Sequence, residues 1–254
     1  MRAPSRPVCG FNKISSLGPG NGACGNRTIF KVNGVKRRII TTGDGSKTIQ
    51  IEEWNEQYHS LHGAVQEAYH VFIDHGLRHL PQNQLDILEI GFGTGLNALI
   101  TFSEAQKEHK KIRYCGVEKY PVSIGEIKQL NYCEALGFKK LQEIFAKMHI
   151  CDWQKEVAIH ENFLLIKRQQ DFLEIDDQNA FDLVYFDAFG ARVQPELWTV
   201  EVFEKMFKAL RSKGVLVTYA AKGSVRRAMQ SVGFSVERLP GPPGKREMLR
   251  ATKP

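Results

Sequence analysis

From residue 85 onward, the apolar and polar positions follow two alternating periods. Short apolar runs rich in β-branched and aromatic residues predict five strands, at residues 85–90, 112–118, 162–169, 181–188 and 215–220. Between them, apolar residues recur every three or four positions and predict helices, at residues 96–107, 121–137, 140–148, 199–214 and 225–233. This alternation of strands and helices predicts an α/β fold with a mostly parallel sheet and helices on both faces.

The last part of the chain carries finer signals. Ser224 is positioned to cap the helix that follows it, and residues 234–239 and 246–252 are predicted to form an antiparallel pair of strands. One apolar stripe in the helix at 199–214 is predicted to be buried: Val200, Phe203, Phe207 and Leu210.

The chain before residue 85 has a different character. Residues 1–28 are rich in glycine and predict a disordered extension. Residues 29–84 predict a lead-in packed on the main domain at 85–254, beginning with a hairpin that has Asn-Gly and Asp-Gly turns. A helix with one apolar stripe is expected to follow the hairpin, and the stripe consists of Leu61, Val65, Ala68 and Phe72.

Composition narrows the classes of protein. The chain of 254 residues is 42% hydrophobic and has no apolar run near the roughly 20 residues that span a bilayer, so no membrane association is expected. It has no secretory signal and its five cysteines show no zinc-like spacing, so a cytoplasmic protein without a metal is expected. His59 and His62 lack a third ligand. The net charge of +7 favours an anionic partner such as a nucleic acid, although a basic enzyme can carry the same charge.

A glycine-rich turn joins the first predicted strand of the main domain to the first helix. It reads Glu-Ile-Gly-Phe-Gly-Thr-Gly and places Gly91, Gly93 and Gly95 where open α/β sheets bind ligands. Glu89 beside this turn would repel a pyrophosphate but would attract a ligand that carries ammonium and sulfonium groups. Such a ligand is S-adenosylmethionine. A nicotinamide cofactor fits less well, because its loop is usually GxGxxG.

Two further acids stand at matching strand ends. Glu118 follows Gly91 by about the interval expected of a ribose-binding acid. Asp171 could accept a hydrogen bond from an adenine amino group. Each acid alone is equally compatible with a solvated strand end, but together with Glu89 they predict a site for an adenosyl ligand.

Several segments resemble a known family. "EIGFGTGLN", "VEKYP", "YFDAFGARVQPELWT" and "GSVRRAMQSVGFSVERLPGPPGKREML" look like the methyltransferase domain of bifunctional MnmC proteins, and the resemblance runs from about residue 42 to residue 252. It implies the class I, Rossmann-like fold of S-adenosylmethionine-dependent methyltransferases, with an antiparallel C-terminal strand. Because 254 residues leave no room for the oxidase domain of MnmC, the stand-alone MnmD type is the better match and no FAD is expected.

The resemblance also assigns roles to residues. It implies that Asn97 belongs to the cofactor loop with Glu89, Gly91 and Gly93, and that Asp187 is the active-site aspartate. Phe92 is expected to line the same pocket. Ala191 stands where the family usually has proline, which leaves the conformation of the loop after Asp187 open.

The implied reaction methylates the exocyclic amine of 5-aminomethyl-(2-thio)uridine at the wobble position, so tRNA, through its anticodon loop, is the expected partner. Asp187 would orient this amine or take its proton, unless it only contacts the cofactor. Phe189 and Trp198 are candidates for holding a flipped base, although Trp198 could instead anchor the core. Contacts to the RNA phosphates are expected from basic residues of the C-terminal third: Arg192, Lys222, Arg226, Arg227, Lys245 and Arg246.

Two other functions use the same pattern. A polyamine-synthase-like aminopropyl transferase, or another small-amine N-transferase, shares the fold and the strand-end acids but needs further acids in its pocket, where the loop here offers Arg192. A tRNA-binding protein without catalysis would have no need of Glu89, Glu118, Asp171 and Asp187.

Overall fold

The computed structural model describes residues 29–32 and 35–254. The prediction for residues 1–28, and the Asn-Gly turn at 33–34, lie outside this part of the chain. The described helices include none that is long and apolar enough to cross a bilayer.

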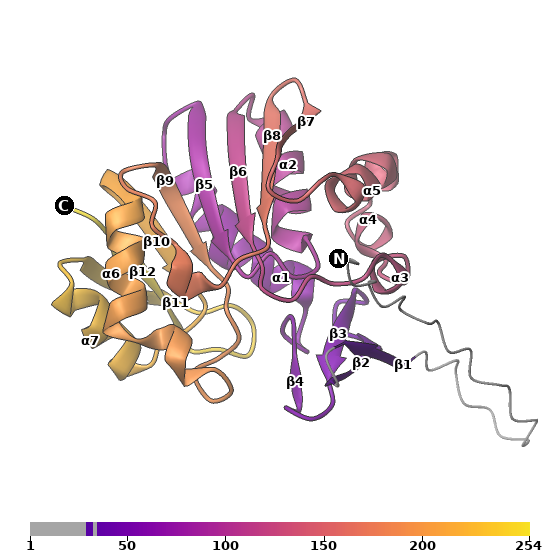
Figure 1. Cartoon of the computed structure of the whole chain (residues 1–254), viewed down its shortest axis with the longest axis horizontal. Helices are drawn as coiled ribbons and strands as arrows, with labels where there is room; N and C mark the ends of the chain where they lie inside the picture. Colours follow the sequence, from indigo (N-terminus) through magenta and orange to yellow (C-terminus); the bar gives the residue numbers. More distant parts are fainter. Residues whose placement is uncertain (1–28, 33–34) are drawn as a thin grey trace, which may run out of the picture.

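A sheet of eight strands forms the centre of the molecule (Figure 1). Its strand order is β11-β12-β10-β9-β5-β6-β8-β7. The five central strands run parallel: β5 (Gln84–Ile90), β6 (Lys111–Val117), β8 (Phe163–Arg168), β9 (Phe181–Phe186) and β10 (Leu210–Thr218). Three outer strands pair with their neighbours in antiparallel fashion: β7 (Glu156–His160), β11 (Ser235–Pro240) and β12 (Glu247–Thr252). The predicted parallel sheet and C-terminal antiparallel pair are therefore confirmed, and β7 is an additional strand.

Helices cover both faces of this sheet. On one face, α1 (Ala64–Ala68), the π-helical segment Tyr69–Asp74 and α2 (Leu96–Lys107) pack over a buried apolar cluster. On the other face, α6 (Val200–Ala209) and α7 (Gly223–Ser231) pack over a second cluster. The remaining helices are α3 (Ile124–Ile127), α4 (Tyr132–Ala135), α5 (Gln142–Ile150) and 3₁₀ turns at Leu77–His79, Lys139–Leu141, Phe172–Glu174 and Pro195–Trp198.

Several local predictions about helices are wrong. The lead-in helix begins only at Ala64, and Leu61 is half exposed rather than part of a buried stripe. The helix α6 ends at Ala209 because the next residue, Leu210, pairs with β9 in the sheet, so strand pairing outweighs local helix propensity. Val200, at the start of α6, is also half exposed. Ser224 lies inside α7, whose cap position is occupied by Lys222 without a side-chain hydrogen bond.

A small antiparallel sheet precedes the main sheet in sequence. It consists of β1 (Ile29–Val32), β2 (Val35–Thr41), β3 (Lys47–Ile51) and β4 (Glu56–Gln57) in that order. The predicted strands and the Asp-Gly turn between β2 and β3 are present. Figure 1 shows this sheet beyond the carboxyl ends of β5 and β6. This position brings its last strand to the edge where parallel sheets bind ligands.

Candidate active site

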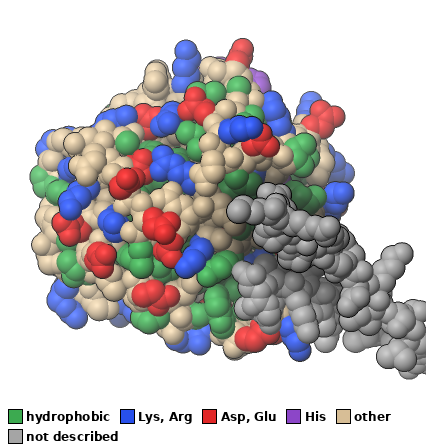
Figure 2. All heavy atoms as spheres, in the orientation of Figure 1, with side chains coloured by type: hydrophobic (Ala, Val, Ile, Leu, Met, Phe, Trp, Pro, Cys, Tyr) green, Lys and Arg blue, Asp and Glu red, His purple; other side chains and the backbone are tan. Residues whose placement is uncertain are grey.

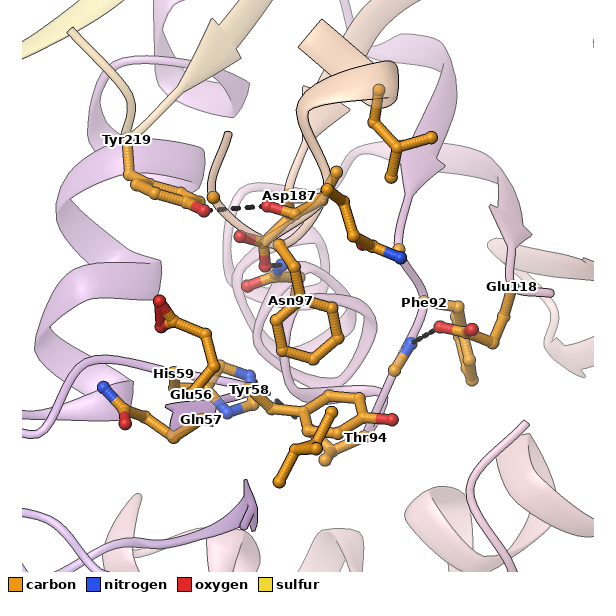
Figure 3. A pocket seen from close by; sticks show the side chains of 18 of the residues that line it. Glu56, Gln57, Tyr58, His59, Phe92, Thr94, Asn97, Glu118, Asp187 and Tyr219 are labelled. Carbon is orange, nitrogen blue, oxygen red and sulfur yellow. Dashed lines mark hydrogen bonds between the residues drawn. The ribbon is translucent and has the colours of Figure 1, made fainter. Parts of the chain in front are cut away.

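The glycine loop between β5 and α2 forms the floor of a cavity of about 830 Å³ (Figure 3). Gly91 has φ +92°, a conformation that favours glycine, and a Cβ added there would lie 2.7 Å from the carbonyl oxygen of Asp187. The backbone N–H groups of Gly91 and Phe92 both donate to the carbonyl oxygen of Val117, at 3.0 Å. The loop therefore holds the ends of β5, β6 and β9 close together.

A buried amide joins two carboxyl groups at the base of this cavity. The Asn97 Nδ2 donates to Glu89 Oε1 at 2.9 Å and to Asp187 Oδ2 at 2.8 Å. Two buried acceptors in the cluster, Glu89 Oε2 and Asn97 Oδ1, have no hydrogen-bond partner among the described residues. Burial, and for Glu89 the nearby Asp187, raises the pKa of both carboxyl groups well above the usual range. The cluster thus offers open acceptors to a cationic ligand.

The two other predicted acids lie at the far side of the glycine loop. Glu118, at the end of β6, accepts hydrogen bonds from the backbone N–H of Gly93 at 3.1 Å and of Tyr120 at 2.9 Å. Asp171 lines the cavity, but it is also paired with Lys119 at 2.6 Å, and this hydrogen bond lowers its pKa. Glu118 reaches the cavity from a strand end, as predicted, whereas Asp171 lies three residues beyond β8 and caps the 3₁₀ turn Phe172–Glu174.

A second, aromatic wall comes from the end of the small sheet, around β4, and Tyr58 in this wall packs against Gly93 of the glycine loop. Its residues Trp54 and Tyr58 are not among the predicted site residues. Trp54 and Tyr58 line the cavity with Phe189 of the loop after β9. The ring of Phe189 lies edge-on to both, with centroids 5.7 Å from Trp54 and 5.0 Å from Tyr58. The aromatic residues in "WNEQY" are the sequence signal for this wall. Their spacing of four residues fits one face of a helix equally well, so the signal is weak.

His59 connects this wall to the glycine loop. Its Nδ1 lies 3.0 Å from Thr48 Oγ1, and its Nε2 lies 3.5 Å from Thr94 Oγ1. Burial lowers the pKa of His59 to about 4, so the imidazole is neutral at physiological pH. His59 is therefore a structural link between the two sheets rather than a source of charge.

The structure corrects the prediction for Trp198. Its side chain is 6% exposed, packs against Phe186 and Phe203, and donates its indole N–H to the carbonyl oxygen of Phe189 at 2.8 Å. Trp198 therefore anchors the loop in the core and does not face the cavity. Phe92 touches the cavity, but its ring is buried over Gly116. Gly95 caps α2 and does not line the cavity.

The predicted basic residues separate into two groups. Lys245 lines the cavity and pairs with Glu67. Arg192 pairs with Glu56 at 2.8 Å and has an exposed side chain outside the cavity. Four others also lie outside the cavity: Lys222, Arg226, Arg227 and Arg246. On the face in Figure 2, basic and acidic side chains are interspersed, so the basic residues visible there do not form one continuous patch. Phosphate contacts from these residues stay a prediction.

The match to a protein family defines the class of this site. Residues 108–254 match the model of a family described as S-adenosyl-L-methionine-dependent methyltransferase. The chain belongs to this family. The buried acceptors at Glu89 and Asn97 fit the ammonium group of such a cofactor, and the enzyme uses S-adenosyl-L-methionine as its methyl donor.

Individual relatives narrow the class further. The tRNA 5-methylaminomethyl-2-thiouridine biosynthesis bifunctional protein MnmC of Pseudomonas savastanoi pv. phaseolicola is 30% identical, over 79% of this chain and 32% of that protein. The MnmC of Leptospira borgpetersenii is 29% identical, over 78% and 32%. The chain therefore spans about a third of the length of these relatives.

Solved structures support the fold. The crystal structure of MNMC2 from Aquifex aeolicus has a TM-score of 0.69 and 24% identity, over 86% of this chain and 71% of that one. Spermidine synthase from Thermotoga maritima has a TM-score of 0.53 and 15% identity, over 89% and 72%. The predicted class I methyltransferase fold is confirmed.

Proposed function

We propose that this enzyme methylates the exocyclic amine of 5-aminomethyl-(2-thio)uridine at the wobble position of tRNA. The product would be 5-methylaminomethyl-(2-thio)uridine. The observation that carries the proposal is the placement of Asp187, which stands between the glycine loop and the aromatic wall and is held there by Asn97. The names of the MnmC relatives support this particular acceptor.

The acids of the large sheet hold the cofactor in this proposal. Glu89 and Asn97 accept hydrogen bonds from its ammonium group, Glu118 from its ribose hydroxyls, and Asp171 from its adenine amino group. The bound cofactor supplies a methyl group activated by the sulfonium charge. The backbone N–H bonds to Glu118 from Gly93 and Tyr120 fix this carboxylate at the loop.

Asp187 positions the acceptor amine and takes its proton. An alkylamine is mostly protonated at neutral pH, so it must lose a proton before its lone pair can attack a methyl group. Burial raises the pKa of Asp187, which makes this carboxylate a better proton acceptor than an exposed one. Holding the amine in line with the transferred methyl group supplies much of the remaining rate.

Trp54 and Phe189 receive the flipped base in place of the earlier candidate Trp198. Flipped and single-stranded bases commonly stack on aromatic side chains. The two rings line the cavity, and their edge-on contact leaves aromatic surface toward it. The pyrimidine would then lie on this surface with its aminomethyl group toward Asp187.

A second candidate function has one observation in its favour. On the sequence alone, Arg192 in the loop after β9 argues against an aminopropyl transferase, which needs acids there. The structure places Arg192 outside the cavity, whereas Glu56, Glu67 and Glu196 line it. An acidic wall of this kind suits a polyamine as well as the ammonium group of a modified uridine.

Nucleoside mass spectrometry tests the proposal. The purified protein is incubated with cofactor labelled in its methyl group and with tRNA that carries 5-aminomethyl-(2-thio)uridine. We expect the label in the wobble nucleoside, and we expect Asp187→Ala to lower kcat about 10²- to 10⁴-fold with nearly unchanged cofactor affinity. Parallel reactions contain putrescine, with the labelled cofactor or with its decarboxylated form. An unlabelled tRNA together with a modified putrescine would reject the tRNA assignment in favour of a small-amine transferase.

A further inference from the structure

A lysine and a carboxylate meet across the acceptor side of the cavity. The Lys245 ammonium donates to Glu67 Oε2, although the two residues are 178 positions apart in sequence. The same Nζ lies 3.8 Å from the centre of the Tyr219 ring. A carboxylate and an aromatic face together are the groups that proteins use to bind ammonium ions. All three residues line the cavity.

This ammonium lies next to the proposed reaction centre. The Tyr219 hydroxyl donates to the carbonyl oxygen of Ala188 at 2.8 Å (Figure 3). Ala188 is the residue directly after Asp187. The charges of Glu67 and Lys245 are close enough to act on Asp187 in opposite directions, with Glu67 raising its pKa and Lys245 lowering it. The lysine therefore places a primary ammonium group where the amine of the acceptor is expected.

We propose that Glu67 and the ring of Tyr219 form a binding site for the ammonium group of the acceptor, and that Lys245 occupies this site as a tethered competitor in the free enzyme. The acceptor would displace Lys245, bind to Glu67 as an ammonium ion, and then pass its proton to Asp187. The inference rests on one part of the proposed function, namely that the acceptor of the methyl group is an amine. It does not depend on that amine belonging to tRNA.

The surroundings of Lys245 allow this exchange. Its side chain is 33% exposed, so the ammonium can turn toward solvent, whereas Glu67 is 10% exposed and would be left as a buried charge. A buried carboxylate without a partner attracts a cation strongly. Gly244, the residue before Lys245, packs closely against the ring of His62. A tethered group competes at an effective concentration of the order of millimolar.

The sign of one substitution separates this role from a phosphate contact. If Lys245 binds tRNA phosphates, as expected from the sequence, Lys245→Met weakens acceptor binding. If Lys245 is a competitor, Lys245→Met strengthens it. A simple probe, propylammonium, isolates the ammonium site because it has no phosphate. Its Kd is measured by calorimetry on enzyme saturated with S-adenosylhomocysteine.

We expect Lys245→Met to lower the Kd for propylammonium about three- to tenfold, of the order of the competition from a tethered group. Lys245→Arg should behave like the unaltered enzyme, and Glu67→Gln should raise the Kd. The control is Lys208→Met, which removes a lysine from a surface pair with Glu204 at 2.7 Å on α6. It should leave the Kd unchanged.

An unchanged or raised Kd in a folded Lys245→Met protein would overturn the inference, and it does so whether or not Glu67→Gln folds. Failure of the proposed function looks different. In that case the unaltered enzyme does not label tRNA, while the effect of Lys245→Met on propylammonium binding is still observed.

Discussion

The two walls of the cavity are built in different ways. The wall from the large sheet consists of strand ends joined by short loops, and its polar groups bond to one another and to nearby backbone, as Asn97 does with Glu89. The wall from residues 54–67 is held by strand pairing with β3 and by the packing of Ala64 in the core, and two of its carboxylates also pair with basic side chains that are distant in sequence. Arg192 pairs with Glu56, and Lys245 pairs with Glu67.

This difference corresponds to the two substrates of the proposed reaction, the methyl donor and the amine acceptor. The strand-end wall can be rigid because the methyl donor is the same in every member of the class. The aromatic wall carries two ion pairs in which the basic side chain is more exposed than the carboxylate, so that Arg192 and Lys245 can exchange partners. Substitutions in the glycine loop and at Glu89 and Glu118 should therefore affect the cofactor, and substitutions in the aromatic wall should affect the acceptor.

Gly91→Ala should have the largest effect of the substitutions that test this division. The new Cβ would overlap the Asp187 carbonyl oxygen at 2.7 Å and would require an unfavourable φ. A displacement of the loop by even 1 Å can lower the rate about 100-fold, and we expect a loss of at least this size in kcat/KM together with weaker cofactor binding by calorimetry.

The matched control is Gly137→Ala. Gly137 has a similar left-handed φ of +68°, but a Cβ there would meet nothing within 4 Å. This variant should lose some thermal stability through backbone strain alone and should bind the cofactor normally. Equal cofactor affinity in both variants would mean that the close approach of the glycine loop to β9 is unimportant.

Trp54→Ala tests the other wall and should have a moderate effect. Loss of a stacking partner for a base typically costs about 1–3 kcal/mol, so the KM for tRNA should rise roughly tenfold or more. The Kd for the cofactor should change less than twofold, because the ring of Trp54 packs against Phe189 on the proposed acceptor side of the cavity. Steady-state kinetics with tRNA and calorimetry with cofactor measure the two quantities.

The control for Trp54 is Ile150→Ala, a large exposed apolar residue on α5 that lies outside the cavity. It should leave both constants unchanged. If Trp54→Ala weakened the cofactor instead of the tRNA, the assignment of the two walls would have to be reversed.

The sequence is informative for the strand-end wall and uninformative for the other. Strand periodicity and the glycine spacing are local signals, so they are enough to locate Glu89, Glu118 and Asp187 at neighbouring strand ends. The pairing of Glu67 with Lys245 depends on how a lead-in segment folds over a C-terminal loop, which no local pattern encodes. Trp198 is ambiguous for the same reason, since an aromatic residue after a strand can face either the cavity or the core.

The smallest effect concerns the stability cost of the strand-end wall. The pKa of Glu89 is raised in the folded protein, so the folded state holds a proton over a pH range in which the unfolded state has lost it. Without cofactor, Glu89 therefore lowers stability as pH rises from the ordinary carboxyl pKa to the raised one. Glu89→Gln removes this penalty, and its Tm relative to the unaltered protein should increase as the pH rises above the ordinary carboxyl pKa of about 4. A gain in Tm of about 2–4 °C is expected for each kcal/mol by which the free energy of unfolding increases.

With saturating cofactor the unaltered protein should have the higher Tm, because only the unaltered protein gains binding energy from Glu89. If the difference in Tm between Glu89→Gln and the unaltered protein without cofactor did not change with pH, the pKa of Glu89 would not be raised by folding. Glu89 would then already be ionised in the free enzyme before the cofactor binds.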